Sequence, residues 1–469
     1  MEEINEIHFL KLLSSKTVSE HTDFLINFKN VTSINLNQVT LSNKFINCKF
    51  KGKKVTFTNP SLDELELTHI FSFNDCEFEN DISFTDCFIQ EITFLNISKP
   101  IKKLHLGAKK IGYFTFECTE NLNQEILNNI NITIYNCEIV NYLEFLHLKS
   151  SGNLDILRCN INQLKIHDSK FKRIDINYNK FLKDFQFSKN IVEDSYIKYN
   201  KFEKTNFSFT DFGSNANFKF NDFKSTALFE KLKNKKWGTI KFISCNFFKY
   251  VHFNKSELYK LHIDTSKFQE FASFQDLELN SIFLDRTIFE KPAFFDDIQI
   301  HKFDDCDKRT LRNVKQQLLR ADNKIDYDEF RAQELNSYKE ELKNKIKLKS
   351  TINRKKLKRD LIILKVNSFF SNNGTDWVKA IKNTLFVAFL FYSIFFVIFN
   401  YKREFDLGGY NEYFMGLFRY FLLTDIHNPL TEKSEYLDNI ITWIPFIFGK
   451  ILIGIGVYHI LVSFRKFKR

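Results

Sequence analysis

The sequence lacks the residue patterns of common catalytic and cofactor sites. It contains no Gly-rich phosphate-binding loop, no nucleophile elbow and no Cys-x-x-Cys pair, and its 11 histidines are dispersed without ligand spacing. No cluster of histidine and cysteine has the spacing of a metal site. We therefore predict a protein that is not an enzyme and that holds no metal or cofactor.

The amino terminus also lacks the basic start and apolar core of a signal peptide, since it reads Met1-Glu-Glu-Ile-Asn-Glu6. We therefore expect the chain to begin in the cytoplasm. Ile4, Ile7, Leu10 and Leu13 have helical spacing, which predicts a short amphipathic helix within a cap over residues 1–30. Such a helix would cover the open edge of the domain that follows.

A five-residue period dominates the middle of the chain. Between Ile156 and Phe223, eleven of the thirteen steps between large apolar residues are five residues long and two are six. This period fits neither a helix face nor one alternating strand, but it fits a coil whose successive faces each turn one large side chain inward. The inward residues are Ile156, Ile161, Ile166, Phe171, Ile176, Phe181, Phe187, Val192, Ile197, Phe202, Phe207, Phe212, Phe218 and Phe223.

Small or polar residues precede every second inward residue by two positions. They fit the crowded corner beside a large side chain and can form ladders from coil to coil. These residues are Cys159, Ser169, Asn179, Asn190, Asn200, Thr210 and Asn221. The pattern resembles the pentapeptide-repeat family, which implies a mainly β fold, the right-handed quadrilateral β-helix. The family usually has a small, Ala-like residue where this chain has Cys, Asn or Ser, so the coils are expected to be looser than the family's.

A weaker form of the same pattern extends from Phe45 to Phe295. At about 20 residues per coil, this length gives about twelve coils. We therefore predict a β-solenoid over residues 31–304. The pattern is weakest between Asn96 and Thr133, where we expect an inserted loop or a flattened coil.

Six of the eight cysteines occupy one slot of an apolar-x-x-Cys-x motif. We interpret them as buried, reduced thiols that act as small hydrophobic residues, which suits a reducing compartment. They are Cys48, Cys76, Cys87, Cys137, Cys159 and Cys245.

Charge is distributed unevenly between the two parts of the chain. Residues 1–340 contain 47 basic and 47 acidic side chains, whereas residues 341–469 contain 21 and 10, so the net charge of +11 belongs to the last quarter. A solenoid that binds nucleic acid needs a basic stripe and one that mimics DNA needs an acidic surface, so we predict no nucleic-acid partner. One basic segment, 231–237, reads as a protruding loop. With Lys235, Lys236 and Trp237 it is either a solvated surface loop or a binding finger.

Two apolar runs near the carboxyl end are long enough to cross a bilayer. They cover about 380–401 and about 440–464 in a domain that we place at 379–469. Basic clusters at 343–359 and 465–469 flank the pair, and the segment between the runs is net acidic. The positive-inside rule then predicts two spans with both termini in the cytoplasm, and the clusters favour contact with anionic lipids of the bilayer.

Residues 305–378 connect the solenoid to the first run. Helical spacing on both sides of a polar turn at 322–326 predicts an α-helical hairpin that docks on the last coil, followed by a basic juxtamembrane linker.

Four short motifs carry a second resemblance. They are Leu311-Arg-Asn-Val-Lys315, Asp328-Glu-Phe-Arg-Ala332, Asn372-Asn-Gly-Thr-Asp-Trp377 and Ser463-Phe-Arg-Lys-Phe467. Together these are similar to bacterial membrane proteins that join pentapeptide repeats to two membrane helices, some of which look like degenerate ion channels. The resemblance implies a multi-pass protein of the bacterial inner membrane.

The membrane end contains three candidate functional residues. Tyr413–Leu423, which includes Arg419, lies between the spans where a two-helix channel has its pore helix. Because no glycine-rich filter follows it, we favour an interfacial helix rich in Phe and Tyr over a pore helix. Lys450 either lines a pore or pairs with a carboxylate, or it marks the outer boundary of a shorter span, Ile451–Phe464, with Pro445 breaking the chain just before it. His459 in the second run is a packing residue or a proton relay.

The function that these features favour is a membrane-anchored cytoplasmic scaffold or sensor with an unidentified protein partner on the solenoid. The alternative is a regulatory solenoid attached to an oligomeric, channel-like pore, in which several copies of the chain surround one axis.

Overall fold

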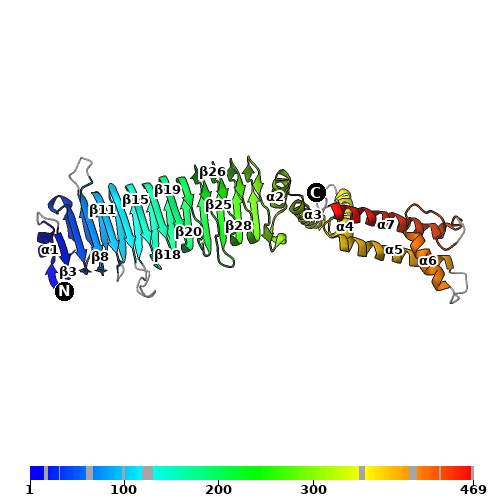
Figure 1. Ribbon diagram of the computed structural model, residues 1–469, viewed down its shortest axis with the longest axis horizontal. Helices are drawn as coiled ribbons and strands as arrows, with labels where there is room; N and C mark the ends of the chain where they lie inside the picture. The colour runs from blue at the N-terminus through cyan, green and yellow to red at the C-terminus, as the bar shows by residue number, and fades with distance from the viewer. Residues whose placement is uncertain are drawn as a thin grey trace. The chain divides into compact units, whose positions relative to one another are not determined.

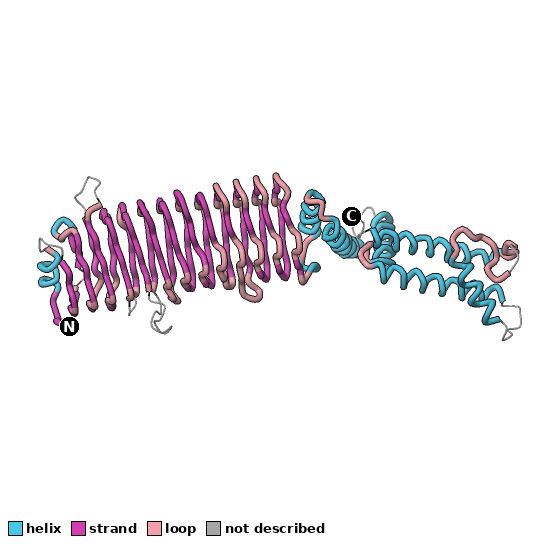
Figure 2. The backbone as a smooth tube through the Cα atoms, in the orientation of Figure 1, coloured by secondary structure: helices cyan, strands magenta, loops and turns pink. Residues whose placement is uncertain are grey.

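The computed structural model describes residues 1–14, 19–30, 32–59, 67–97, 101–118, 130–347, 354–400, 409–431 and 435–465, with 409–412 described by their backbone only. The chain divides into two compact units, Met1–Cys306 and Asp307–Arg469. Figure 1 and Figure 2 show strands stacked in the first unit and helices in the second.

The first unit is a mainly β, parallel solenoid of about 12 turns. Equivalent residues of successive turns lie in register, as Ile156, Ile176, Ile197 and Phe218 do along one ladder of strands. The predicted β-solenoid is therefore confirmed, while its handedness and quadrilateral section stay predictions.

The strands form three parallel ladders. The shortest joins β1 (Glu2–Asn5), β3 (Phe24–Phe28), β6 (Lys49–Gly52) and β9 (Glu77–Phe78). The second joins β4 (Thr32–Asn35), β7 (Val55–Thr58), β10 (Ile82–Thr85), β12 (Lys103–Gly107), β14 (Asn131–Tyr135), β16 (Asn153–Leu157), β18 (Lys170–Asn177), β20 (Ile191–Lys198), β22 (Asn215–Lys219), β25 (Thr239–Ile243), β28 (Glu257–Asp264), β31 (Glu278–Asp285) and β34 (Gln299–Ile300).

The third ladder begins as one row and divides in two after β21, which pairs with both β23 and β24. Its single row is β2 (Ser19–Thr22), β5 (Ser42–Ile46), β8 (His69–Asn74), β11 (Phe88–Leu95), β13 (Lys110–Glu117), β15 (Glu138–Leu146), β17 (Asn160–His167), β19 (Lys180–Ser188) and β21 (Lys201–Asn206). The divided rows are β23 (Asp222–Phe223), β26 (Asn246–Phe247), β29 (Lys267–Phe268) and β32 (Ile288–Phe289), and β24 (Ala227–Leu228), β27 (Val251–His252), β30 (Ala272–Ser273) and β33 (Ala293–Phe294).

The inward column is confirmed residue by residue. All fourteen side chains predicted between Ile156 and Phe223 are at most 2% exposed. Rings of successive turns stack in this column, with Phe202 4.9 Å from Phe181 and 5.1 Å from Phe223 between centroids. Burying such rings removes apolar surface from water at every turn and stabilises the stack.

The polar corner residues form the predicted ladder. The side-chain amide of Asn179 donates to Asn200 Oδ1 at 3.1 Å, and that of Asn200 donates to Asn221 Oδ1 at 3.1 Å. Asn200 Oδ1 also accepts the backbone N–H of Asn179 at 2.9 Å. The residue before each corner has a left-handed backbone, with φ of 60° at Tyr178 and 57° at Tyr199. The buried amide thus satisfies a backbone group that the bend removes from the strand ladder.

All eight cysteines are buried as thiols, which agrees with the predicted role of the six in the repeated motif. Burial raises the pKa of Cys159 to about 11 and that of Cys245 to about 12, which keeps these thiols protonated near neutral pH.

The amino-terminal cap differs from the prediction in its helix register. Ile4 lies in strand β1, so α1 (Glu6–Leu13) begins later than expected and turns Phe9 and Leu13 inward, while Ile7 and Leu10 are exposed. The Phe9 ring packs 5.4 Å from Phe28. Strands β1, β2 and β3 also lie within residues 1–30, which are therefore not a purely helical cap.

The weak stretch between Asn96 and Thr133 keeps the coil path. Strands β12 and β13 pair with β14 and β15 in the next turn. Part of the expected insertion falls on residues 98–100 and 119–129, which lie outside the described residues.

The second unit contains the helices α2 (Lys308–Arg320), α3 (Lys324–Lys347), α4 (Arg354–Ser371), α5 (Trp377–Asn400), α6 (Gly409–Phe421) and α7 (Ile440–Arg465). The predicted hairpin is α2 and α3, joined through Glu334, which accepts from Arg312 Nε at 2.8 Å and Lys315 Nζ at 2.6 Å. Its docking on the last coil stays a prediction. The basic linker predicted after this hairpin contains helix α4, and its Lys349 lies outside the described part.

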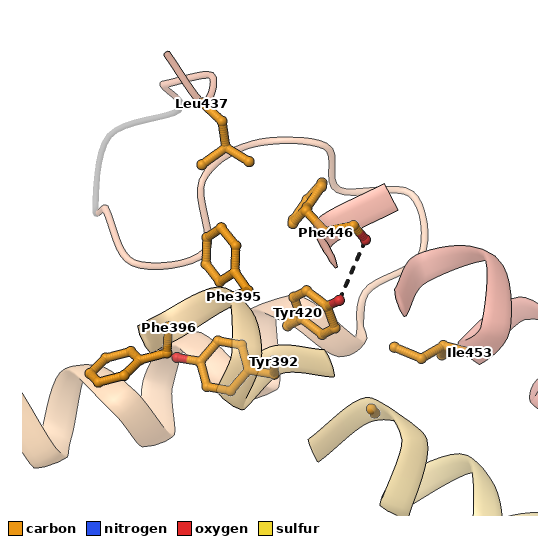
Figure 3. Packing of buried hydrophobic residues seen from close by; sticks show 8 residues of the cluster. Tyr392, Phe395, Phe396, Tyr420, Leu437, Phe446 and Ile453 are labelled. Carbon is orange, nitrogen blue, oxygen red and sulfur yellow. Dashed lines mark hydrogen bonds between the residues drawn. The ribbon is translucent and has the colours of Figure 1, made fainter. Parts of the chain in front are cut away.

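Helices α5 and α7 are long and apolar enough to cross a membrane. They are antiparallel, because Trp377 at the start of α5 packs 5.2 Å from Phe464 at the end of α7, and Phe395 packs 5.8 Å from Phe446 near the other ends. Gly456 permits their close approach, since a Cβ there would lie 2.2 Å from Thr384 Oγ1. Figure 3 shows the aromatic core that α5, α6 and α7 share.

Candidate functional site

The predicted basic loop at 231–237 is shorter than expected. Leu232 is buried, and its N–H donates to Ser256 Oγ at 3.0 Å. Lys233 forms parallel bridges with Asp211 and Glu257 in the neighbouring turns. The inward position of Leu232 therefore keeps this part in the coil, and the surface turn is closed by the N–H of Gly238, which donates to the Lys235 carbonyl at 2.8 Å.

Lys235 forms an ion pair with Glu193, which lies two turns earlier in the solenoid. The hydrogen bond from Lys235, with a second from Ser214, lowers the pKa of Glu193 below its usual range. An exposed pair of this kind adds little stability, but it holds the turn in place.

Trp237 is 70% exposed on this turn. Its ring lies 4.9 Å from the Tyr259 ring, and the amines of Lys236 and Lys302 lie 5.6 and 6.0 Å from its centroid. We call these four residues the Trp237 patch. Lys236 and Tyr259 also line a shallow depression of about 370 Å³, with Glu278, Asn280 and His301. The patch therefore presents aromatic rings and two cations beside this depression, and these are groups that a binding partner can contact.

A row of exposed rings on the solenoid was missed by the sequence analysis. Tyr178, Tyr199 and Phe220 occupy the same left-handed corner in three successive turns, and their rings stack at 4.7 and 4.9 Å. We call them the outer aromatic row. Each ring precedes one of the polar corner residues Asn179, Asn200 and Asn221 by one position, and this spacing was the available signal.

Two of the candidate residues at the membrane end bind the chain segment that follows α6. Lys450 Nζ donates to the carbonyl of Leu422 and lies 5.3 Å from the ring centroid of Tyr420. Arg419 Nη1 donates to the carbonyl of Thr431 at 2.8 Å. The ammonium group of Lys450 thus lies at the carboxyl end of α6. This end of a helix attracts a cation, because its unpaired carbonyls carry partial negative charge.

Pro445 does not break the helix that contains Lys450. Helix α7 is continuous from Ile440 to Arg465, so the predicted break before Lys450 is wrong. The hydroxyl of Tyr420 donates to the Pro445 carbonyl at 3.1 Å. The level of Lys450 in a bilayer stays a prediction.

Close packing holds α6 against α5 and α7. The Tyr392 hydroxyl of α5 donates to the Tyr413 carbonyl at 2.8 Å. A Cβ on Gly416 would lie 2.2 Å from the Tyr392 hydroxyl, and one on Gly449 would lie 1.9 Å from the Tyr420 hydroxyl. Both glycines are therefore required by shape. The chain has the order long helix, short helix, long helix in one packed core, as Figure 3 shows around Tyr392 and Tyr420.

His459 links α7 to the end of α4. Its Nδ1 lies 2.9 Å from Ser371 Oγ, and its ring stacks on Phe370 with centroids 5.7 Å apart. These contacts fit the packing interpretation of this histidine.

The segment after α6 offers little for coordination chemistry. Asp425 Oδ1 accepts the N–H of His427 at 3.0 Å, and this hydrogen bond lowers the pKa of Asp425. Within the described residues, no group of three or more His, Cys, Asp and Glu side chains is arranged to hold a metal ion.

No protein-family model, curated protein or solved structure matches the chain.

Proposed function

We propose that the protein is a membrane-anchored β-solenoid of the pentapeptide-repeat type that acts as a protein-interaction scaffold or sensor on the cytoplasmic side of a bacterial inner membrane. The observation that carries this proposal is the Trp237 patch. Large aromatic rings elsewhere in the solenoid mostly point inward, whereas Trp237 is 70% exposed beside a hollow. Exposed tryptophan rings with neighbouring cations are typical of binding surfaces.

The antiparallel pair α5 and α7 supports the anchor. Two apolar helices that start and end beside each other bring α4 and the carboxyl end of α7 to one side of a bilayer, and the segment around α6 to the other. With basic residues at 354–359, the positive-inside rule assigns the first side to the cytoplasm.

A photoreactive amino acid at position 259 tests the scaffold function in living cells. We expect it to cross-link one protein reproducibly, and we expect Trp237→Ala to reduce that adduct at least tenfold, because the ring lies against residue 259. The same probe at Tyr250, an exposed aromatic of the preceding turn, is the matched control. An adduct that is unchanged by Trp237→Ala, or equal yields at 250 and 259, would exclude the patch as the binding surface.

Cysteine labelling in intact cells tests the topology. All native thiols are buried, so a single added cysteine can be labelled without replacing them. An impermeant maleimide should label the Tyr436→Cys variant and should not label the Leu319→Cys variant, since both positions are exposed. The reverse result would invert the topology, and labelling of both in intact cells would exclude the two-span anchor.

A second candidate function is an oligomeric, channel-like pore regulated by the solenoid. It is favoured by one observation, the packing of the short α6 between α5 and α7 with Lys450 at its carboxyl end. Ion flux through liposomes that contain the purified protein tests it. A conductance whose anion and cation preference changes in Lys450→Glu would favour the pore, whereas no flux in either protein would favour the scaffold.

A further inference from the structure

Helix α4 is held on one side by the rest of its unit. Lys339 Nζ of α3 donates to Ser368 Oγ at 3.2 Å, and Lys379 Nζ of α5 donates to the Ser368 carbonyl at 2.9 Å. Ser371 Oγ lies 2.9 Å from Nδ1 of His459 in α7. Leu364, four positions before Ser368 and seven before Ser371, is buried on this packed side. One side of α4 is therefore fixed against α3, α5 and α7, and the opposite side is left uncovered.

The opposite side of α4 carries exposed apolar side chains. Ile362 and Phe369 are 61 and 46% exposed. At 100° per residue, Ile362 and Phe369 project in nearly the same direction, because they are seven positions apart. Large apolar side chains in a row on an exposed helix face indicate a surface that water does not normally cover.

The amino-terminal half of α4 is basic and unneutralised. The helix contains six basic residues and one acidic residue, 6 − 1 = +5. Five of the basic side chains are exposed, and among the described residues none of them makes an ion pair. They are Arg354, Lys355, Lys356, Lys358 and Arg359.

The carboxyl end of α4 meets the apolar surface of α5. The side-chain amide of Asn383 donates to the Phe369 carbonyl, which places Phe369 beside the second turn of α5. Leu385, Phe386 and Phe389 of α5 follow and are about half exposed. An apolar surface thus continues from Ile362 through Phe369 onto the helix that we propose to span the bilayer.

We propose that α4 lies in the membrane surface as an interfacial helix, with Ile362 and Phe369 among the acyl chains and its basic half on the headgroups of anionic phospholipids. This inference rests on the proposed membrane anchor. A charge of +5 beside an apolar stripe selects an anionic bilayer, because the stripe inserts at the level of the headgroups while the cations remain in contact with the phosphates.

The full chain in lipid nanodiscs tests this inference. An environment-sensitive fluorophore is attached to single added cysteines in the Ile362→Cys, Phe389→Cys and Lys183→Cys variants, and the unaltered chain, whose eight thiols are buried, measures background labelling. Each protein is placed in phosphatidylcholine alone and in phosphatidylcholine with phosphatidylglycerol. Quenching by nitroxide-bearing lipid then reports contact with acyl chains.

We expect the Phe389→Cys probe to be quenched in both nanodiscs and the Lys183→Cys probe, on the solenoid, in neither. The Ile362→Cys probe should be quenched strongly with phosphatidylglycerol and weakly without it. Each basic residue near an anionic surface changes partitioning roughly fivefold. Adding Lys355→Gln, Lys358→Gln and Arg359→Gln to the Ile362→Cys variant should therefore weaken the effect of phosphatidylglycerol on partitioning roughly a hundredfold.

The outcomes separate this inference from the anchor on which it rests. If the Phe389→Cys probe is not quenched, the anchor itself is wrong. If that probe is quenched but the Ile362→Cys probe stays in water in both nanodiscs, α4 does not bind the membrane. If the Ile362→Cys probe is shielded from water but insensitive to lipid nitroxide and to phosphatidylglycerol, a protein surface such as a second copy of the chain covers α4, which also overturns the inference.

Discussion

Replacing Phe202 by alanine tests whether burial or ring stacking holds the solenoid together. Phe202 is fully buried, and its ring stacks between Phe181 and Phe223 at 4.9 and 5.1 Å. Tyr199 lies three residues earlier in the same turn, and its ring stacks between Tyr178 and Phe220 at 4.7 and 4.9 Å on the surface. The two sites therefore share ring geometry and differ in exposure.

We expect Phe202→Ala to destabilise its turn by about 3–5 kcal/mol, the usual cost of removing a buried phenyl ring and leaving a cavity. Tyr199→Ala should cost no more than about 1.5 kcal/mol, because it removes stacking contacts that remain open to water. The difference between the two variants measures what burial contributes beyond stacking.

Hydrogen exchange of the full chain, followed by mass spectrometry, measures both effects on peptides that cover β20 and β21. Because each turn of a solenoid contacts only its neighbours, the exchange rate in these strands reports how much stability the substituted turn has lost. Phe202→Ala should speed exchange there by roughly a hundred- to several-thousand-fold, and Tyr199→Ala by roughly tenfold or less. Equal acceleration in the two variants would refute the reasoning, since stacking rather than burial would then account for the stability.

Further predictions concern the helical unit and the thiols. Gly456→Val should force α5 and α7 apart and lower the melting temperature of the purified protein by an amount equivalent to about 1–3 kcal/mol. Gly454→Val should not, because a Cβ there has its nearest neighbour 4.0 Å away. Equal effects of the two substitutions would contradict the packing of Gly456 against Thr384. Burial alone would raise the pKa of Glu334, but hydrogen bonds from α2 lower this pKa below the usual 4.5. The ionised Glu334 side chain therefore stabilises the fold fully above pH 4.5, and this contribution is lost as the pH falls through the lowered pKa. The difference in melting temperature between the unaltered chain and Glu334→Gln should therefore shrink on acidification, and a difference independent of pH would exclude this role. A thiol reagent should modify no cysteine of the native protein at neutral pH and all eight after denaturation, because burial shields them and raises the pKa of Cys159 to about 11; rapid modification of the native chain would disprove the buried column.

The inward column and the corner residues could be predicted because burial constrains side-chain type. A position that faces the solenoid axis has to be large and apolar at each five-residue step, as Phe202 is, and its corner neighbour has to be small or able to bond buried backbone, as Asn200 does. The two apolar helices were predictable for a similar reason, since a bilayer-spanning helix needs about 20 apolar residues in succession.

The surface of the solenoid was not predictable in the same way. Outward residues are under no burial constraint, so the sequence left open which of them align from turn to turn. Tyr178, Tyr199 and Phe220 form a row only because each occupies the left-handed corner of its turn. The Trp237 patch likewise depends on Tyr259 and Lys302, which the coil path brings to it from later turns.

The sequence by itself determined a solenoid with an inward five-residue column, the burial of its repeated cysteines and two long apolar helices, because these features depend on local side-chain type repeated at a fixed spacing or in one long run. Only the tertiary structure decided the contacts that join distant segments. Lys450 meets the carbonyl of Leu422, His459 meets Ser371, and α4 leaves Ile362 and Phe369 uncovered because of how α3, α5, α6 and α7 pack together. Such contacts depend on the relative positions of whole helices, and no periodicity within one segment encodes those positions.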